Sequence, residues 1–345
     1  MTKVFKFFVF LVVFLLFMMS AQDGLAGDSP LLRELIEPNS IALDQRQIYI
    51  PEGTSIYIYD LKDFRLKKRV GQRGEGPQEF LLDVLRGAEE LFIDVWTPVL
   101  LVNSLGKVSF FNKGDGSFIR ELRSHTGAQE FKPLGRGFAG QGMVAEEGIQ
   151  YRSVNIYDSR LNKAKEVLKV KHHFQMGEGL RVLPAAMKFA TCGRKLFIAW
   201  DEDFVIRVFD QEGSPLYTIK REYERLKVSE RFKEQIVAYF KTHKRYKRIF
   251  ELLNPKIIFP ATFPAIADMK IADGKIYVTT YRVDEDNAGA TQCFVFDVDG
   301  KFLKELTIPL RRRDELLPYP YAVSAGKLYQ LVEEGEHWRL KITEL

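Results

Sequence analysis

A short apolar strand that ends in Asp or Asn recurs along this chain and sets the fold. The copies cover residues 56–60, 108–112, 154–158, 205–210 and 293–297, and a sixth copy without the acid covers 338–342. Most steps between copies are close to the roughly 40–50 residues of one β-propeller blade, and the step from 210 to 297 adds an insertion. The repeat therefore predicts an all-β, six-bladed β-propeller.

A second strand precedes each copy. These strands are expected at residues 47–50, 91–95, 143–145, 196–200, 275–280 and 328–332. They are short and rich in Ile, Val, Tyr and Phe with period-two alternation, which argues against a helical solenoid. Counting back from them places one residue of each innermost strand in a ring around the axis: Ser40, Asp83, Gly135, Lys188, Asp268 and Pro320.

The residues after the sixth copy are too few to form the outer strand of the sixth blade. Residues 31–38 near the N-terminus resemble residues 302–309, the outer strand expected for blade five. We therefore predict that residues 31–37 complete the last blade, because this removes two exposed strand edges. The alternative is a loose N-terminal arm.

The first 26 residues have the pattern of a secretory signal peptide. Lys3 and Lys6 precede an apolar run over residues 7–19, and a small-residue site follows at 24–27. The run is short for a membrane span, which needs about 20 residues. We predict cleavage after Ala26, a mature propeller over residues 27–345 and a periplasmic or secreted protein. An uncleaved anchor is the alternative.

The composition limits the classes of partner that the protein is expected to bind. A net charge of +5 is too mild an excess to indicate nucleic-acid binding. We expect a monomer without a cofactor. The two cysteines, Cys192 and Cys293, fall at opposite ends of neighbouring blades, so we expect two buried free thiols rather than a disulfide.

Residues 70–80 read VGQRGEGPQEF, and the second half of this motif recurs at 127–131. The motif resembles the G-x-x-G-x-G-P-x-E-F connection of NHL-like six-bladed propellers, a group of exported bacterial proteins. The resemblance implies the fold and export, but not one activity, because propellers host both binding modules and enzymes.

The same Gly-rich loop has a structural explanation. Gly71, Gly74 and Gly76 permit positive φ, Pro77 fixes a turn and Phe80 can enter the core. A phosphate-binding loop would need a helix directly after it, whereas residues 81–85 read as a strand. A structural role is therefore favoured.

Few residues indicate catalysis. No two of the five histidines have the spacing of a helical metal site, and we predict no metal. An alternative to a binding role is a lyase or hydrolase that acts on a carbohydrate or lactone in the central funnel. The weak catalytic candidates are Asp83, Asp268, His172 and His173.

Residues 228–253 interrupt the β-repeat between blades four and five. Their apolar residues recur three and four apart, Ser229 can cap the start, and a break is expected near Thr242. The polar side of this helical insertion is basic: Lys241, Lys244, Arg245, Lys247 and Arg248. It is either a solvated helix face or a docking surface for an acidic glycan or protein.

The leading hypothesis is an exported binding or scaffold module that meets its partner at the face carrying the insertion, since loops there commonly carry function. The expected contact residues at loops and strand ends are Arg73, Glu75, Glu79, Trp200, Tyr281, Arg282, Tyr319 and Tyr321.

The leader pattern makes a testable prediction. Mass spectrometry of the protein from its native cell envelope is expected to find a mature chain that begins near Gly27, because the small residues 24–27 form the cleavage site. An intact leader in a membrane-held form would contradict cleavage.

Overall fold

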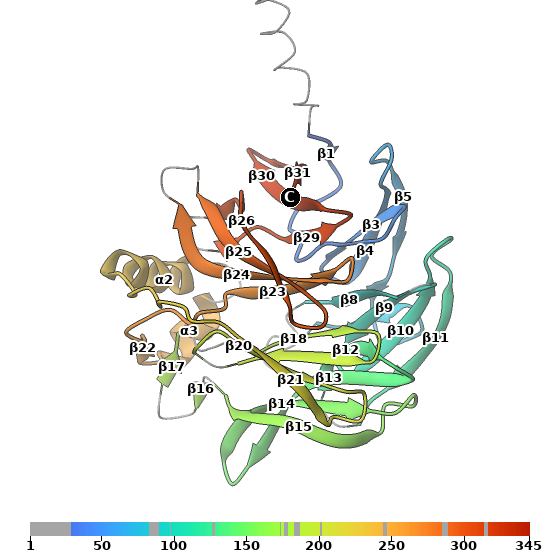
Figure 1. Ribbon diagram of the computed structural model, residues 1–345. Coiled ribbons are helices and arrows are strands. Elements are labelled where there is room, and N and C mark those ends of the chain that lie inside the picture. The colour runs from blue at the N-terminus through green and yellow to red at the C-terminus, as the bar shows by residue number, and fades with distance from the viewer. Residues whose placement is uncertain are drawn as a thin grey trace, which may run out of the picture.

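Six four-stranded antiparallel sheets form a ring in the computed structural model (Figure 1). The structure describes residues 29–82, 90–96, 98–125, 128–172, 174–175, 179–182, 187–200, 202–243, 247–284, 289–313 and 317–345. The innermost strands contact one another in the order β2, β8, β12, β18, β23 and β29, and β29 contacts β2 again. The predicted six-bladed propeller is confirmed.

Each blade follows the chain from its innermost to its outermost strand. Blade one contains β2 (Ala42–Leu43), β3 (Gln47–Glu52), β4 (Ser55–Asp60) and β5 (Leu66–Val70). Blade two contains β8 (Phe92–Trp96), β9 (Val99–Ser104), β10 (Lys107–Asn112) and β11 (Phe118–Arg123). Blade three contains β12 (Ala128–Leu134), β13 (Gly137–Glu146), β14 (Ile149–Tyr157) and β15 (Lys163–Lys171).

Blade four contains β18 (Lys188–Cys192), β19 (Lys195–Ala199), β20 (Val205–Phe209) and β21 (Pro215–Lys220). Blade five contains β23 (Asp268–Ala272), β24 (Lys275–Asp284), β25 (Ala290–Asp297) and β26 (Phe302–Ile308). Blade six contains β29 (Tyr321–Ser324), β30 (Lys327–Glu334), β31 (His337–Glu344) and the N-terminal β1 (Leu31–Leu32).

This connectivity gives the ring two different faces. The outer-to-inner connections, among them residues 221–267, open on one face, which we call the insertion face. The turns from each innermost strand to the second strand open on the opposite face, which we call the turn face. Each innermost strand therefore runs from the insertion face to the turn face.

The acid that marks each repeat closes a hairpin on the turn face. The Asp158 carboxylate accepts hydrogen bonds from the backbone N–H groups of Arg160 (2.8 Å) and Asn162 (2.9 Å). Asp210 and Asp297 accept the equivalent pairs from their own turns. A carboxylate that caps its own turn explains why the third strand of the blade ends in Asp or Asn.

Lysines join neighbouring blades at these hairpins. Lys68 donates to the carbonyl oxygen of Asp115 in the next blade (2.7 Å), and Lys165 donates to that of Gly213 (2.8 Å). Lys195 reaches the Asp299 carboxylate at 2.6 Å. Most of the buried apolar side chains form clusters between adjacent blades, and these lysines add polar contacts across three of those interfaces.

The N-terminal segment closes the ring, as predicted. Leu31 pairs with Arg339 and Leu32 with Trp338 in an antiparallel register. Leu32 is fully buried, and the Trp338 indole N–H donates to the carbonyl oxygen of Ile36 at 3.0 Å. The strand is only two residues long, shorter than the predicted 31–37, because the chain turns directly after it. The alternative prediction of a loose N-terminal arm is therefore wrong.

One register prediction is wrong. Residues 91–95 were expected as the second strand of blade two, but β8 is its innermost strand and β9 follows it. Both strands are short and apolar, so either fits the repeat. The expected ring therefore holds only in part, because Lys188 and Asp268 begin their innermost strands as predicted, but Gly135 lies in the turn after β12. Ser40 and Pro320 just precede β2 and β29, and Asp83 lies outside the described residues.

The insertion is helical, as predicted, and contains α2 (Glu230–Thr242) and α3 (Lys247–Leu253) (Figure 1). Ser229 caps α2 by accepting a hydrogen bond from the Phe232 N–H at 3.2 Å. The Phe240 and Phe250 rings stack with centroids 5.8 Å apart, which joins the two helices. After them, β22 (Ile257–Ile258) pairs with β17 (Gly179–Arg181), which pairs with β16 (Phe174–Gln175).

Three smaller features complete the fold. In the connections of the insertion face, β6 (Gln72–Arg73) pairs with β7 (Glu79–Phe80), and β27 (Arg312–Arg313) pairs with β28 (Leu317–Pro318). Both cysteines are free, as predicted, but only Cys293 is buried, which raises its thiol pKa to about 12. In the described part of the chain, no helix is long and apolar enough to cross a membrane.

Substituting the closing residue is expected to destabilise the whole ring. Leu32→Ala leaves a cavity against Trp338, and the expected loss in the free energy of unfolding is about 2–5 kcal/mol. Ile36→Ala is the matched control, since Ile36 is 82% exposed and its loss is expected to change stability by under about 0.5 kcal/mol. Chemical denaturation measures both, and equal stabilities would contradict the closing role.

Candidate functional site

Charged side chains on the innermost strands lie near the axis of the ring. In blades two and three, the Lys132 ammonium lies 3.1 Å from Glu130 and 3.7 Å from Asp94. In blade five, the Lys270 ammonium lies 3.3 Å from Asp268. The axis therefore holds charges that are largely neutralised by one another.

The two axial aspartates differ in their pKa. Burial raises the pKa of Asp94, and the nearby Lys132 charge does not reverse this shift. Burial also acts on Asp268, but the charges of Lys270 and Lys188 and a hydrogen bond from Tyr321 outweigh it and hold its pKa below the ordinary value. The surroundings of Asp268 therefore stabilise its ionised form.

Asp268 lies in a cluster at the insertion-face end of the axis. The Tyr321 hydroxyl donates to its carboxylate at 2.9 Å. Burial and the Asp268 charge raise the pKa of Tyr281 to about 12. The structure thus brings together three predicted site residues, but Asp268 is already held by its neighbours. The hypothesis of a lyase or hydrolase that uses it stays a prediction.

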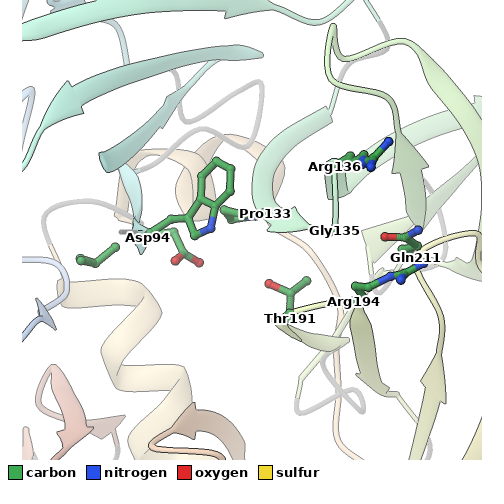
Figure 2. A pocket seen from close by; sticks show the side chains of 10 residues that line it. Asp94, Pro133, Gly135, Arg136, Thr191, Arg194 and Gln211 are labelled. Carbon is green, nitrogen blue, oxygen red and sulfur yellow. The ribbon is translucent and has the colours of Figure 1, made fainter. Parts of the chain in front are cut away.

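A cavity of about 760 Å³ opens at the other end of the axis, on the turn face. It lies where β8, β12 and β18 end and their turns begin. Figure 2 shows Arg136, Arg194 and Gln211 on one side of it and Asp94 on the other. The described residues of its wall are Asp94, Val95, Trp96, Pro133, Gly135, Arg136, Thr191, Gly193, Arg194 and Gln211.

The cavity wall contains an uncovered indole. Trp96 is 44% exposed, and no ring or cation in the described part of the chain packs on it. The other two tryptophans are covered, because the Arg207 guanidinium lies 4.1 Å from the Trp200 ring centre and Trp338 is 2% exposed. An exposed tryptophan in a concave wall is available to a ligand.

Two guanidinium groups share that wall. Arg136 and Arg194 are exposed and form no ion pair with any residue that the structure describes. Each follows a glycine in the turn after an innermost strand, and Gly135 has a φ of 57°. A side chain at Gly135 would collide with Gln211, so the glycine keeps the Gln211 amide at the wall.

The Gly-rich loop of residues 71–80 is structural, as predicted. Phe80 is fully buried, and a side chain at Gly71 would collide with its ring. The Gly76 N–H donates to the Glu79 carboxylate at 2.9 Å, and Lys107 donates to the Gly76 carbonyl at 3.0 Å. Gly71 and Gly74 do have positive φ, but residues 81–82 are not in the predicted strand.

The other expected contacts on the insertion face do not converge. Trp200 packs under Arg207, Tyr319 packs 5.8 Å from Trp338, and Arg282 lies over the Tyr223 ring at 6.0 Å. In the Gly-rich loop, the predicted contacts Arg73 and Glu75 are exposed and Glu79 is half-buried. These residues stay predicted contacts.

The basic side of the insertion is only partly described. Lys241, Lys247 and Arg248 are exposed, and the Lys247 ammonium lies 4.0 Å from Glu251. His172 is half-buried, and its backbone N–H donates to Gln150 at 2.8 Å. The remaining predicted residues lie outside the described ranges: Asp83, His173, Lys244 and Arg245. In those ranges no cluster of three or more His, Cys, Asp and Glu could hold a metal ion.

Sequence reasoning missed the turn-face cavity. A signal was present, since Gly135-Arg136 and Gly193-Arg194 are the same dipeptide in the same turn of successive blades. The register error in blade two concealed it, because residues 91–95, which include Asp94, were assigned to a second strand, and Trp96 directly follows them. Arg46 in blade one lies in the corresponding turn.

No protein-family model and no curated protein matches the sequence. Among solved structures, the chain is similar to a protein described as exported from Bacteroides fragilis, with 14% identity and a TM-score of 0.48, covering 89% of this chain and 81% of that one. It is also similar to a member of the DUF4221 family from Bacteroides vulgatus, with 11% identity, a TM-score of 0.44 and coverage of 92% and 96%. None of these similarities bears on the ligand.

The Asp268 cluster makes a prediction about pH. A carboxylate whose folded pKa is lowered stabilises the fold above its unfolded pKa of about 3.9 and loses that effect as the pH falls through the folded value. Asp268→Asn is therefore expected to cost about 1–3 kcal/mol at pH 7, and the difference from wild type is expected to shrink below about pH 4.

Urea denaturation across this pH range measures the effect. Asp203→Asn is the control, since the Asp203 side chain is 79% exposed and its ion pair with Arg225 spans 3.9 Å. A difference between wild type and Asp268→Asn that stays constant with pH would contradict the charge interaction.

Proposed function

We propose that this protein is an exported binding module that takes an acidic ligand into the turn-face cavity. One observation carries the proposal. Arg136 and Arg194 form no ion pair with any described residue, and they line the same cavity as the exposed Trp96. Arg and Trp are the residue types most enriched where binding energy concentrates. No reaction is part of the proposal.

The charge balance of the cavity favours an anion. Lys132 lies within 3.7 Å of Asp94, so the negative charge in the wall is opposed by a nearby ammonium. The two guanidinium groups have no such neighbour in the described chain. An unbalanced positive field at a concave mouth concentrates anions and raises their rate of association.

The guanidinium geometry adds specificity to that attraction. Arginine presents a planar fork of donors that matches a carboxylate, sulfate or phosphate group with two parallel hydrogen bonds. Arg136 and Arg194 come from equivalent turns of neighbouring blades, and Figure 2 shows them on the same side of the cavity. One anionic group that lies between them could bind both forks.

The proposal also includes export of the protein and its resemblance to NHL-like propellers. The leader pattern over residues 1–26 supports a periplasmic or secreted protein. The motif over residues 70–80, with its buried Phe80 and its closed loop, supports an NHL-like propeller. A ligand for such a protein would come from the cell envelope or the medium.

The basic insertion stays a second proposed surface for an acidic glycan or protein partner. Lys241 and Arg248 are exposed, which supports it, but Glu230 and Glu234 lie on the same helix. The net positive charge of the described helices is therefore smaller than the basic residues alone suggest. Replacing Lys241, Lys244, Arg245, Lys247 and Arg248 by Gln separates this surface from the cavity in any binding assay.

Removing both cavity arginines is expected to abolish selective binding of acids. Thermal unfolding of the purified protein is measured with small carboxylated, sulfated and phosphorylated compounds. At a ligand concentration of 100 times Kd, bound ligand stabilises the fold by about 2.7 kcal/mol. For the double variant Arg136→Gln/Arg194→Gln, affinity is expected to fall by about tenfold or more for each lost charged hydrogen bond.

Arg160→Gln is the matched control. Arg160 is exposed on the same face, in the outer turn of blade three, and is not part of the cavity wall. Its loss removes the same charge and is expected to leave binding unchanged. The proposal fails if no acidic compound stabilises the wild type, or if the double variant responds as the wild type does.

A further inference from the structure

The wall of the turn-face cavity is unusually rich in hydrogen-bonding groups. Thr191 supplies a hydroxyl, Gln211 an amide and Asp94 a carboxyl, and Val95 and Pro133 are its main aliphatic members. Pockets for ligands are usually lined mostly by apolar side chains. A wall of this composition suits a ligand that itself carries many hydroxyl groups.

The polar groups surround a single aromatic surface. Trp96 is the only aromatic side chain among the described residues that line the cavity. A flat aromatic ligand would gain one stacking partner but would leave Thr191, Gln211 and Asp94 without hydrogen bonds, and a buried polar group left unpaired costs about 1–3 kcal/mol. A polyanion without a ring would leave the exposed Trp96 face uncovered. A saccharide ring can cover the Trp96 face and also pair with the polar groups, because it has an apolar face and a rim of hydroxyls.

The arrangement in Figure 2 gives such a ligand an orientation. Arg136 and Arg194 lie on the side of the cavity opposite Asp94, with Thr191 between the two sides. An anionic group would point to the guanidinium groups and the hydroxyls to Asp94. The Asp94 carboxylate accepts hydrogen bonds, and the hydroxyl groups of such a ligand can donate them.

We propose that the turn-face cavity binds an acidic saccharide, with one sugar ring on Trp96, its anionic group between Arg136 and Arg194, and its hydroxyls toward Asp94 and Thr191. The cavity volume of about 760 Å³ has room for a short oligosaccharide. This inference rests on the proposed function and names the ligand class of the same site.

Calorimetric titration with three matched probes tests it. Trigalacturonate carries rings and carboxylates, galactotriose carries rings alone, and tricarballylate carries carboxylates alone. Trigalacturonate is expected to bind the purified protein, and the other two at least about tenfold more weakly. Trp96→Ala is expected to lower the affinity for trigalacturonate by about tenfold and to leave the affinity for tricarballylate unchanged. Trp96→Phe, which keeps a flat ring, is expected to recover most of the affinity.

The possible outcomes separate the two proposals. If tricarballylate binds as tightly as trigalacturonate, and only the double arginine variant weakens it, the saccharide inference is overturned and the acidic-ligand proposal stands. If galactotriose binds as tightly as trigalacturonate, both are overturned. A sulfated trisaccharide that binds in place of trigalacturonate would support the acidic-saccharide class with sulfate as its anion. If no saccharide binds, the inference is wrong.

Discussion

The contact between Leu32 and Trp338 decides whether this chain is a ring or an open array of sheets. Blade six has only three strands from the C-terminal end, so its last edge is completed by residues that lie at the opposite end of the sequence. The pairing is short, yet it buries Leu32 fully and fixes the Trp338 indole through a hydrogen bond to Ile36. Leu32 and Trp338 share one buried cluster with Ile48 and Ile50 of blade one, so loss of the pairing would weaken the interface between blades six and one.

A closed ring has one axis and two ends, and the charges of the innermost strands make these ends different. At the insertion-face end, Asp268 is held by Tyr321 and Lys270, so its charge stabilises the fold. At the turn-face end, the guanidinium groups of Arg136 and Arg194 lack an ion-pair partner in the described chain. Satisfied charges hold a structure together, whereas unsatisfied charges around a cavity are available to a ligand. This asymmetry places the candidate site on the face opposite the helical insertion.

The candidate site was predictable only in part. Asp268, Tyr281 and Tyr321 were each named as candidate site residues, and the structure brings them together because they lie at matching ends of blades five and six. The cavity was not expected, because a one-strand register error in blade two moved Asp94 and Trp96 away from the axis. Alternation has a period of two in every strand, so a shift of one strand leaves the local pattern intact and is invisible without the neighbouring blades.

Local chemistry alone determined the repeating unit of this protein. An Asp that caps its own turn, strands of alternating apolar residues and a helix capped by Ser229 all depend on residues close in sequence, so the sequence predicts the blades and the helices. The closing segment was predicted because residues 31–38 resemble an outer strand. Which side chains converge was decided by the tertiary structure. Arg136, Arg194 and Trp96 come from three blades and meet because the ring closes around one axis, a condition that depends on every interface at once and that no local pattern encodes.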